Sequence, residues 1–459
     1  MKKHIGVALG LWLSLTFLSV SSVSSAATQI VGTKCVKAGT FRTTKNVRYQ
    51  CKKSSQGLRW VKASQAMAPT STNTTTIPLP TQPVTSLTDT SQLASSNLCK
   101  LQYSGSDWSG GLIRTGFPRV DDAFLPPGDV IVQVFPVDFP NLQWVKSPNE
   151  VLQPISTGVT DFYKKVSNGR LNFTWRLATA TVRMPYNVEQ YNLGPTPGNN
   201  STATFAKEAI LEADPFVDFS GADFVLILNP DTVTSNQIYT SPAQQATRRW
   251  ATLTKEGPVF RSTFTSHDTN NNLILGWRII AHEFAHGMGL PDLYKSGGPN
   301  WEYMGQFDLM TGTGGAFELT AWSKWQLSFI SDNQVLCLRP TDEGNFWISH
   351  VSAGSLRPEL VLIRESDTTA IAIEARRKER FDKDAALTTV VDGLLVYRVD
   401  TSFATGKGPL RIIRKIGSTS PAFLDSLLGL NDSITIGGQV IKTKEVGSWG
   451  HVVQVTRSP

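Results

Sequence analysis

The sequence predicts an α+β protein with three folded parts: a small N-terminal disulfide module, a central domain built on a mixed sheet and one amphipathic histidine-bearing helix, and a β-rich C-terminal domain. Three observations predict it. Two cysteines lie close together near the N-terminus, ahead of a Ser/Thr/Pro-rich stretch. Strand-like and helix-like segments then alternate, as in layered α and β structure. From residue 331 onward, short strand-like segments are separated by turn residues.

Length and composition fit a globular protein. The 459 residues are enough for two or three domains, and 40% are hydrophobic while 18% are charged. The formal net charge of +7 is spread along the chain, so it does not indicate nucleic-acid binding. Its expected effect is weak attraction to anionic cell surfaces.

Residues 1–26 resemble a secretory signal peptide, with a basic start (K-K-H), a long apolar run and a small-residue end (S-S-A). No later apolar run is long enough to cross a bilayer, so no membrane anchor is expected after signal removal. The sequence therefore predicts a secreted, extracellular protein, with association with the cell surface as a further expectation.

Residues 27–64 are expected to form a basic disulfide-linked module of two or three short strands, and residues 65–97 a flexible linker. The module could contact an anionic envelope polymer or could be a solvated spacer. In an oxidising compartment we expect the pairs Cys35–Cys51 and Cys99–Cys337, although four cysteines allow three pairings.

Residues 98–330 are predicted to form the central domain, and its elements can be placed in order. The expected strands and helices before the metal-binding helix are a strand at Asp129–Val137, a helix at Val159–Val166, a strand at Leu171–Trp175, a helix at Thr204–Ala213 and a buried strand at Asp223–Asn229. Asp268, Asn270 and Asn272 have the alternate spacing of a calcium loop, but its later glutamate is missing. A polar turn is favoured there, and Ca²⁺ is only a weak candidate cofactor.

The segment Gly276–Leu293 contains the pattern H-E-F-A-H. On a helix, His282 and His286 lie one turn apart on the same face and can bind one zinc ion, while Glu283 can reach a water on that ion. An apolar stripe on the opposite face is expected to anchor the helix in a core; it consists of Trp277, Ile280, Phe284 and Met288.

The helix is expected to end at Gly287–Gly289, with Pro291 preventing its continuation. The chain can then return beneath the histidines and present Asp292 as a third ligand. Three protein ligands leave one position of a tetrahedral zinc for water, as hydrolysis requires. Alternatively, Asp292 only caps the turn, and Glu302 or Glu318 supplies the third ligand.

Beyond the helix, the sequence predicts a tight turn at Met304–Gly312 and an aromatic amphipathic helix at Leu319–Phe329. Residues 331–459 form the predicted β-rich domain, with strands at Phe346–His350, Glu359–Arg364, Ala370–Ala375, Gly393–Val399, Gln439–Ile441 and His451–Val455. No metal or catalytic role is expected for two further groups, one of arginines and one of histidines. Arg376, Arg377 and Arg380 would form a solvated or salt-bridged face, and His267, His350 and His451 lack the sequence spacing of ligands.

Four stretches together resemble the immune inhibitor A (M6-type) family of secreted bacterial zinc metallopeptidases, within the metzincin group. They are H-E-F-A-H-G-M-G-L-P-D-L-Y; V-T-D-F-Y-K-K-V-S-N-G-R-L-N-F; F-D-L-M-T-G with A-W-S-K-W-Q-L; and I-E-A-R-R-K-E-R-F-D with D-G-L-L-V-Y-R-V-D. The resemblance covers roughly residues 125–405, not the N-terminal module.

This resemblance implies a metzincin-like catalytic domain with zinc ligands His282, His286 and Asp292, general base Glu283, and Met310 in a turn under the metal. Members of the family are often made as zymogens or bind calcium. The sequence departs from the usual pattern at Ala285 and Gly287, neither of which is a ligand position.

The predicted function is that of a secreted zinc endopeptidase that hydrolyses peptide bonds of protein or peptide substrates through a zinc-activated water. The substrate is expected to lie as an extended strand along an edge of the catalytic sheet. One alternative is a non-catalytic protein that binds the cell surface or envelope on the same fold. Another is a hydrolase specific for wall peptides or glycoproteins.

Overall fold

A computed structural model describes residues 33–36, 41–44, 47–54, 57–62, 82–105, 112–120, 127–245, 251–272, 275–312, 318–384, 392–420 and 422–459. The chain divides into two compact units, Met1–Pro78 and Leu79–Pro459. The predicted signal peptide and most of the predicted linker lie outside the described residues. Within the described ranges, none of the helices has the length and apolar character needed to cross a membrane.

The first unit contains a three-stranded antiparallel sheet. Its strands follow one another in sequence and in space, with β2 in the centre: β1 (Phe41–Thr44), β2 (Val47–Ser54) and β3 (Gly57–Lys62). The disulfide Cys35–Cys51 joins the segment before β1 to β2. The prediction of a small disulfide-linked β module is thus confirmed.

The second unit begins earlier than the predicted central domain. Residues 82–97, expected to belong to the flexible linker, contain the short helix η1 (Thr90–Gln92) and the start of η2 (Ser96–Cys99). The Thr85 N–H donates to the Glu445 carboxylate at 2.5 Å, and Ala94 bridges to Cys337. The Cys99–Cys337 disulfide, as expected, fixes the same segment. The linker prediction is wrong for these residues because their partners are more than 200 positions away and carry no local signal.

A six-stranded sheet forms the centre of the second unit. The main path runs β5-β4-β7-β11-β8, and β6 pairs with β4. The strands are β4 (Asp129–Asp138), β5 (Asn172–Leu177), β6 (Val182–Arg183), β7 (Phe224–Leu228), β8 (Gln244–Gln245) and β11 (Arg261–Phe264). All pairings are parallel except β8 with β11, so the expected mixed sheet is confirmed.

The α-helices described beside this sheet are α1 (Pro148–Val166), α2 (Ser201–Ala213), α3 (His267–Asn271) and α4 (Gly276–Gly287). The same region contains the short helix η3 (Val188–Tyr191) and a two-stranded sheet of β9 (Thr252–Thr254) and β10 (Gly257–Val259). Helix α1 starts eleven residues before the predicted one. The reciprocal Ser147–Glu150 capping box and Pro148 in the first turn favour this start. Pro154, inside the helix, interrupts the helical pattern in the sequence.

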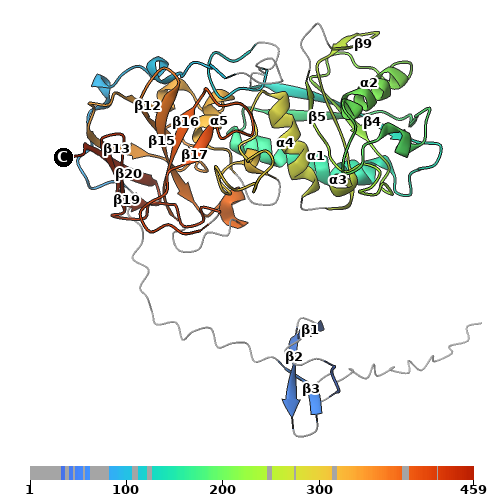
Figure 1. The fold of residues 1–459 in the computed structure, drawn as a ribbon, viewed down its shortest axis with the longest axis horizontal. Helices are drawn as coiled ribbons and strands as arrows, with labels where there is room; N and C mark the ends of the chain where they lie inside the picture. Colours follow the sequence, from blue (N-terminus) through green and yellow to red (C-terminus); the bar gives the residue numbers. More distant parts are fainter. Residues whose placement is uncertain are drawn as a thin grey trace, which may run out of the picture. The chain divides into compact units, whose positions relative to one another are not determined.

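The region after residue 318 contains two sheets whose side chains meet in one apolar core. One sheet has the order β12-β14-β15-β16-β17 and the other β13-β20-β19-β18. The strands are β12 (Val335–Leu338), β13 (Gly344–Ile348), β14 (Leu360–Arg364), β15 (Thr369–Arg377), β16 (Asp392–Asp400), β17 (Leu410–Ile412), β18 (Ser433–Ile436), β19 (Gln439–Gly447) and β20 (Gly450–Arg457). Figure 1 shows these strands, in orange and red, gathered apart from the central sheet. The predicted α+β class is confirmed.

The elements between the sheets are short: η4 (Leu309–Thr311), α5 (Ala321–Gln326), η5 (Asp332–Gln334) and η6 (Arg380–Asp384). All of them except η5 contribute to, or pack against, a continuous core that also includes residues of the central sheet and of β14–β16. Arg376, expected on a solvated or salt-bridged face, is 1% exposed and pairs with Glu374 at 2.6 Å and Asp382 at 2.8 Å. The salt-bridged alternative is the one observed, in the interior.

Close packing of α1 against α4 provides a test of this arrangement. A Cβ on Gly158 would lie 2.2 Å from Cγ of Trp277, the base of a side chain that cannot move away by changing its outer rotamer. We therefore expect Gly158→Ala to lower the free energy of unfolding by about 1–3 kcal/mol, despite the better helix propensity of alanine.

Chemical denaturation of the purified chain measures this change. The matched control is Gly128→Ala, because a Cβ at Gly128 meets nothing within 4 Å. Equal stability of the two variants would contradict the close approach of the helices.

Candidate metal centre

Helix α4 is held by its apolar face. Ile280, Phe284 and Met288 are buried, and Trp277 packs partly buried against the same core, as the stripe in the sequence predicts. The Phe284 ring stacks on Phe224 of β7 with centroids 4.5 Å apart. The Tyr163 hydroxyl of α1 donates to the Ala281 carbonyl oxygen at 2.6 Å. The helix is therefore fixed in rotation, and the histidines face away from this core.

The end of α4 turns the chain back toward those histidines. Gly289 has a φ of +90°, a left-handed conformation that favours glycine and ends the helix. The Leu290 N–H donates to the Ala285 carbonyl oxygen at 3.0 Å, which closes the turn. A Cβ on Gly289 would also meet the Arg119 guanidinium at 2.2 Å. The predicted stop is confirmed, and Pro291 and Asp292 follow it at once.

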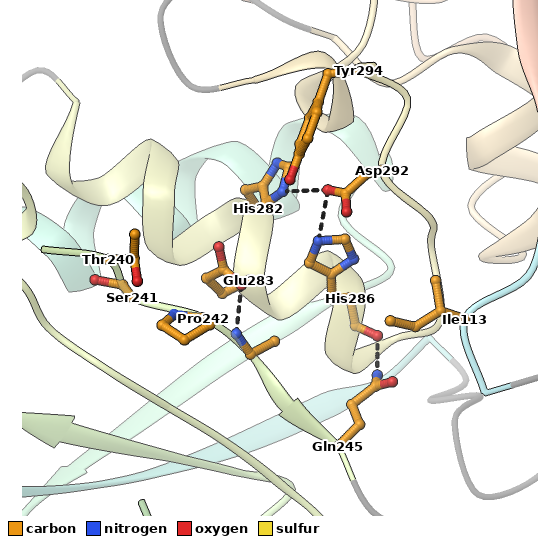
Figure 2. Close-up of a pocket in the computed structure, with 11 residues that line it drawn as sticks. Ile113, Thr240, Ser241, Pro242, Gln245, His282, Glu283, His286, Asp292 and Tyr294 are labelled. Carbon is orange, nitrogen blue, oxygen red and sulfur yellow. Dashed lines mark hydrogen bonds and ion pairs between the residues drawn. The ribbon is translucent and has the colours of Figure 1, made fainter. Parts of the chain in front are cut away.

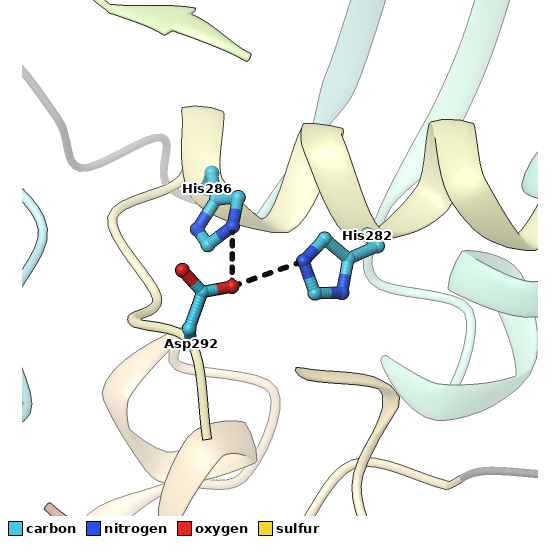
Figure 3. A group of neighbouring side chains, drawn as sticks. All are labelled: His282, His286 and Asp292. Atoms are coloured by element: carbon cyan, nitrogen blue, oxygen red, sulfur yellow. Dashed lines mark hydrogen bonds and ion pairs between the residues drawn. The ribbon is translucent and has the colours of Figure 1, made fainter. Parts of the chain in front are cut away.

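Three candidate ligand atoms converge where the chain turns back after α4. Asp292 Oδ1 lies 3.2 Å from His282 Nε2 and 3.1 Å from His286 Nε2, as Figure 3 shows. Ligand atoms about 3.3 Å apart are what a tetrahedral zinc with bonds of about 2.0–2.1 Å requires. The chemistry of the set, two imidazoles and one carboxylate, also suits zinc. The residues present therefore fit a zinc-type ion.

The other polar atoms of the three groups are already engaged. His282 Nδ1 donates to the Leu309 carbonyl oxygen at 3.2 Å, and His286 Nδ1 donates to the Leu290 carbonyl oxygen at 2.7 Å. The Thr405 hydroxyl lies 3.2 Å from Asp292 Oδ2 and accepts from the Asp292 N–H at 2.8 Å. Such outer contacts select the tautomer and leave each Nε2 for a metal. Thr405 belongs to the C-terminal region, so residues 98–330 alone do not complete the site.

In the absence of a metal, His286 and Asp292 shift each other's pKa in opposite directions. Burial opposes the charged form of His286, but the Asp292 carboxylate outweighs it and raises the pKa to about 9. Burial likewise opposes ionisation of Asp292, yet His286 and His282 keep its pKa well below the ordinary value. Burial raises the pKa of Glu283, against the opposing effect of both histidines.

A cavity of about 330 Å³ opens over these groups. Its lining includes Glu283 together with His282, His286 and Asp292, and the segment Thr240–Gln245 forms one wall (Figure 2). The Ala243 N–H donates to Glu283 Oε2 at 2.6 Å. The carboxylate of Glu283 is therefore held on the wall of the same cavity that the ligand atoms face.

Two features of this cavity were missed in the sequence. Tyr294 lines it, with its ring stacked near the His282 ring at a centroid distance of 6.3 Å. Burial, followed by the charges of Asp292 and Glu283, raises the Tyr294 pKa well above its ordinary value. Tyr294 follows the candidate ligand Asp292 by two residues in the D-L-Y sequence, and this proximity was the feature of the sequence that could have indicated it. The wall at Thr240–Gln245 carried none, because its position depends on β8 pairing with β11.

The alternative ligands lie elsewhere. Glu302 pairs with Lys295 at 2.7 Å, and the buried Glu318 lies 3.2 Å from the Arg380 guanidinium. Met310 is buried in the main core, and its carbonyl oxygen accepts from the Leu293 N–H at 2.9 Å. The turn at Leu309–Met310 thus lies against the segment that carries Asp292.

The suggested calcium segment is a short helix rather than a polar turn. The Asn270 side chain donates to the Asn229 carbonyl oxygen at 2.9 Å, and Asn272 Oδ1 accepts from the Leu275 N–H at 2.9 Å. Asp268 pairs with His267 at 3.0 Å. These side chains serve different local contacts. The alternate spacing of a calcium loop is lost because the backbone is helical.

No model of a known protein family matches the chain, and no curated protein matches it. Solved structures of OgpA from Akkermansia muciniphila are similar at 11–13% identity. For one crystal form of the wild-type protein, the aligned region spans 73% of this chain and 97% of OgpA, with a TM-score of 0.30. For a second crystal form it spans 75% of this chain and 100% of OgpA, with a TM-score of 0.29. For catalytically inactive OgpA in complex with an O-glycopeptide (glycodrosocin) substrate, the aligned region spans 74% of this chain and 100% of OgpA, at 11% identity and a TM-score of 0.29. These TM-scores are too low to carry an assignment.

Substitution of Asp292 tests the ligand set. We expect Asp292→Ala to weaken zinc binding at this site by more than about 100-fold, because even outer-shell contacts are worth 10–100-fold. Competition with a chromophoric chelator measures the affinity. Glu302→Gln is the control that retains it. Loss of zinc in the Glu302 variant, with binding unchanged in Asp292→Ala, would reverse the assignment.

Proposed function

We propose that this protein is a secreted zinc-dependent endopeptidase with His282, His286 and Asp292 as zinc ligands and Glu283 as general base. The observation that carries the proposal is the position of the Glu283 carboxylate in the same cavity as the three converging ligand atoms. Secretion is inferred from the signal-like N-terminal sequence.

A bound zinc would supply a Lewis acid that polarises the scissile carbonyl and makes water more acidic. Glu283 accepts the proton from the attacking water and passes it to the leaving amine. Burial, which raises the Glu283 pKa, brings it closer to the value that a base working near neutral pH needs. The Ala243 N–H keeps the carboxylate oriented between these two proton transfers.

Strand β8 is the candidate platform for the substrate. It is the last strand of the main sheet path and pairs only with β11 among the described strands. Gln245 also donates from its side chain to the His286 carbonyl oxygen, which ties β8 to the helix carrying the ligands. An extended peptide added along the free edge of β8 would pass the cavity and place a peptide bond beside Glu283.

Tyr294 is the second polar side chain that can act on the reacting carbonyl. Its phenol lies in the cavity, and its raised pKa keeps the proton on the hydroxyl. A protonated phenol can donate a hydrogen bond to the oxygen that gains charge as water attacks. Tyr294 would then share the stabilisation of that charge.

The immune inhibitor A family, within the metzincins, is the proposed family. It is supported by the four sequence stretches, the left-handed stop at Gly289 and the turn at Leu309–Met310 beside the ligand loop. A non-catalytic envelope-binding protein is the competing function. The base on the cavity wall argues for catalysis, because a binding surface has no need of a buried carboxylate raised in pKa.

Glu283→Ala tests the proposed chemistry. We expect peptidase activity on unfolded protein substrates to fall by about 10²–10⁴-fold, because a general base contributes that much. The variant should retain its zinc, since Glu283 is not a ligand, and zinc content is measured on the same sample. Activity equal to wild type would remove Glu283 from the mechanism; zinc without activity in either protein would favour the envelope-binding alternative.

Tyr294→Phe separates charge stabilisation from packing. The ring remains while the donor is lost, so we expect kcat to fall by about 10–100-fold with little change in KM. Tyr186→Phe is a suitable control because Tyr186 is exposed and does not line the cavity. An unchanged kcat in Tyr294→Phe would show that the hydroxyl plays no part in the reaction.

A further inference from the structure

A second group of metal-type ligands lies in the C-terminal region. It consists of His350, Asp392 and His451, residues whose sequence spacing does not suggest a site. His350 follows β13, His451 is in β20, and Asp392 is the first residue of β16. His451 therefore comes from one sheet of the β region and the carboxylate from the other, while His350 follows a strand of the first sheet and bridges to Ala375 of β15 in the second.

The geometry of this group repeats that of the candidate metal centre. Asp392 Oδ1 lies 3.5 Å from His350 Nε2 and 3.3 Å from His451 Nε2. The two imidazole rings have centroids 4.9 Å apart at 85°, against 4.7 Å and 89° for His282 and His286. These separations again approach the roughly 3.3 Å expected between ligands of a tetrahedral zinc.

The three converging atoms are buried and lack a hydrogen-bond partner. His350 is 1% exposed and His451 is fully buried. No hydrogen bond of normal geometry reaches Nε2 of either histidine or Oδ1 of Asp392; the three atoms meet only at the ion-pair distances of 3.5 and 3.3 Å given above. Buried polar atoms left without partners are costly, so native proteins satisfy them with protein groups, water or an ion. One cation at their centre would satisfy all three.

Contacts of His451 and Asp392 orient their ligand-type atoms as they would around a metal. His451 Nδ1 donates to the Gly450 carbonyl oxygen at 2.6 Å, which favours the tautomer with Nε2 free. Arg377 donates to Asp392 Oδ2 at 2.9 Å and so leaves Oδ1 facing the histidines. The Asp392 side chain is 21% exposed, which gives an ion a route from solvent.

We propose that His350, Asp392 and His451 bind a second divalent ion of the zinc type, which joins the two sheets of the C-terminal region. Two imidazoles and one carboxylate suit zinc or a similar transition metal and not calcium or magnesium, which prefer oxygen ligands. The site is structural in role, because it ties β13 and β20 to β16 in the sandwich and lies among residues that do not line the candidate catalytic cavity. It does not depend on the proposed peptidase function.

The test uses the mature full-length chain carrying His282→Ala and His286→Ala, which removes the first site. Zinc content after gel filtration should be about one ion per chain. Adding Asp392→Asn or His451→Gln should lower it to near zero, while His267→Gln, at an exposed histidine, should leave it unchanged. Cobalt, used as a probe, should give the visible absorption of a tetrahedral ion only where the second site is intact.

Thermal unfolding provides the second measurement. Micromolar zinc should raise the Tm of the two-histidine variant by roughly 2–5 °C, since a ligand that binds only the folded state stabilises it. The same zinc should not shift the Tm of the chain that also carries Asp392→Asn, a substitution of nearly equal size.

A folded two-histidine variant that binds no zinc or cobalt would overturn the proposal. So would binding that persists unchanged in both Asp392→Asn and His451→Gln. Because the first site is absent from every chain compared, neither result bears on the peptidase function, which the Glu283 experiment tests separately.

Discussion

The convergence of two imidazoles on one carboxylate at the end of α4 is the constraint on which the rest of the candidate site depends. A helix brings His282 and His286 to one face, but it cannot bring Asp292 there unless it stops and reverses within six residues. The left-handed Gly289 makes that reversal, and the tight fit around its Cα position leaves no room for a side chain. The apolar stripe then fixes the direction in which the face points.

The C-terminal region completes the site as well as flanking it. The Thr405 hydroxyl accepts from the Asp292 N–H and donates to the Asp292 carboxylate. The Gly406 N–H donates to the Asp292 carbonyl oxygen at 3.0 Å. Deeper in the interior, Glu374 accepts from the Ala321 N–H at 2.7 Å, and Arg376 donates to the Phe307 carbonyl oxygen. Glu374 and Arg376 are charged and buried, so loss of these backbone partners is unfavourable. The β region and the segment from Phe307 to Ala321 are therefore expected to unfold together.

Two clusters of two histidines and one aspartate in this chain have similar geometry and different surroundings. The first lies on a cavity wall with a base and a phenol beside it, so a bound ion could meet substrate. The second lies between two sheets, with its ligands contributed by three strand ends. The contrast follows from what surrounds each group: an open cavity in one case and sandwich core in the other.

Local pattern was enough to predict the position of α4 and its glycine stop, because both depend on residues within one or two helical turns. The alternation of strand-like and helix-like segments predicted the α+β class. The same helical spacing is the basis on which His282, Glu283 and His286 are proposed as site residues. Proximity and turn chemistry also made Asp292 a candidate, and the geometry now favours it over Glu302 and Glu318. The early start of α1 was missed because Pro154 obscured the helical pattern.

Other features depend on contacts between distant residues, and only the tertiary structure decided them. The packing of residues 82–97 against β12 and β19, the cavity wall beside β8, and the role of Thr405 all require partners that local patterns do not reveal. The same holds for His350, Asp392 and His451, which lie 42 and 59 residues apart along the chain. Sequence periodicity reports which face of an element is buried; it does not report which faces from different elements meet.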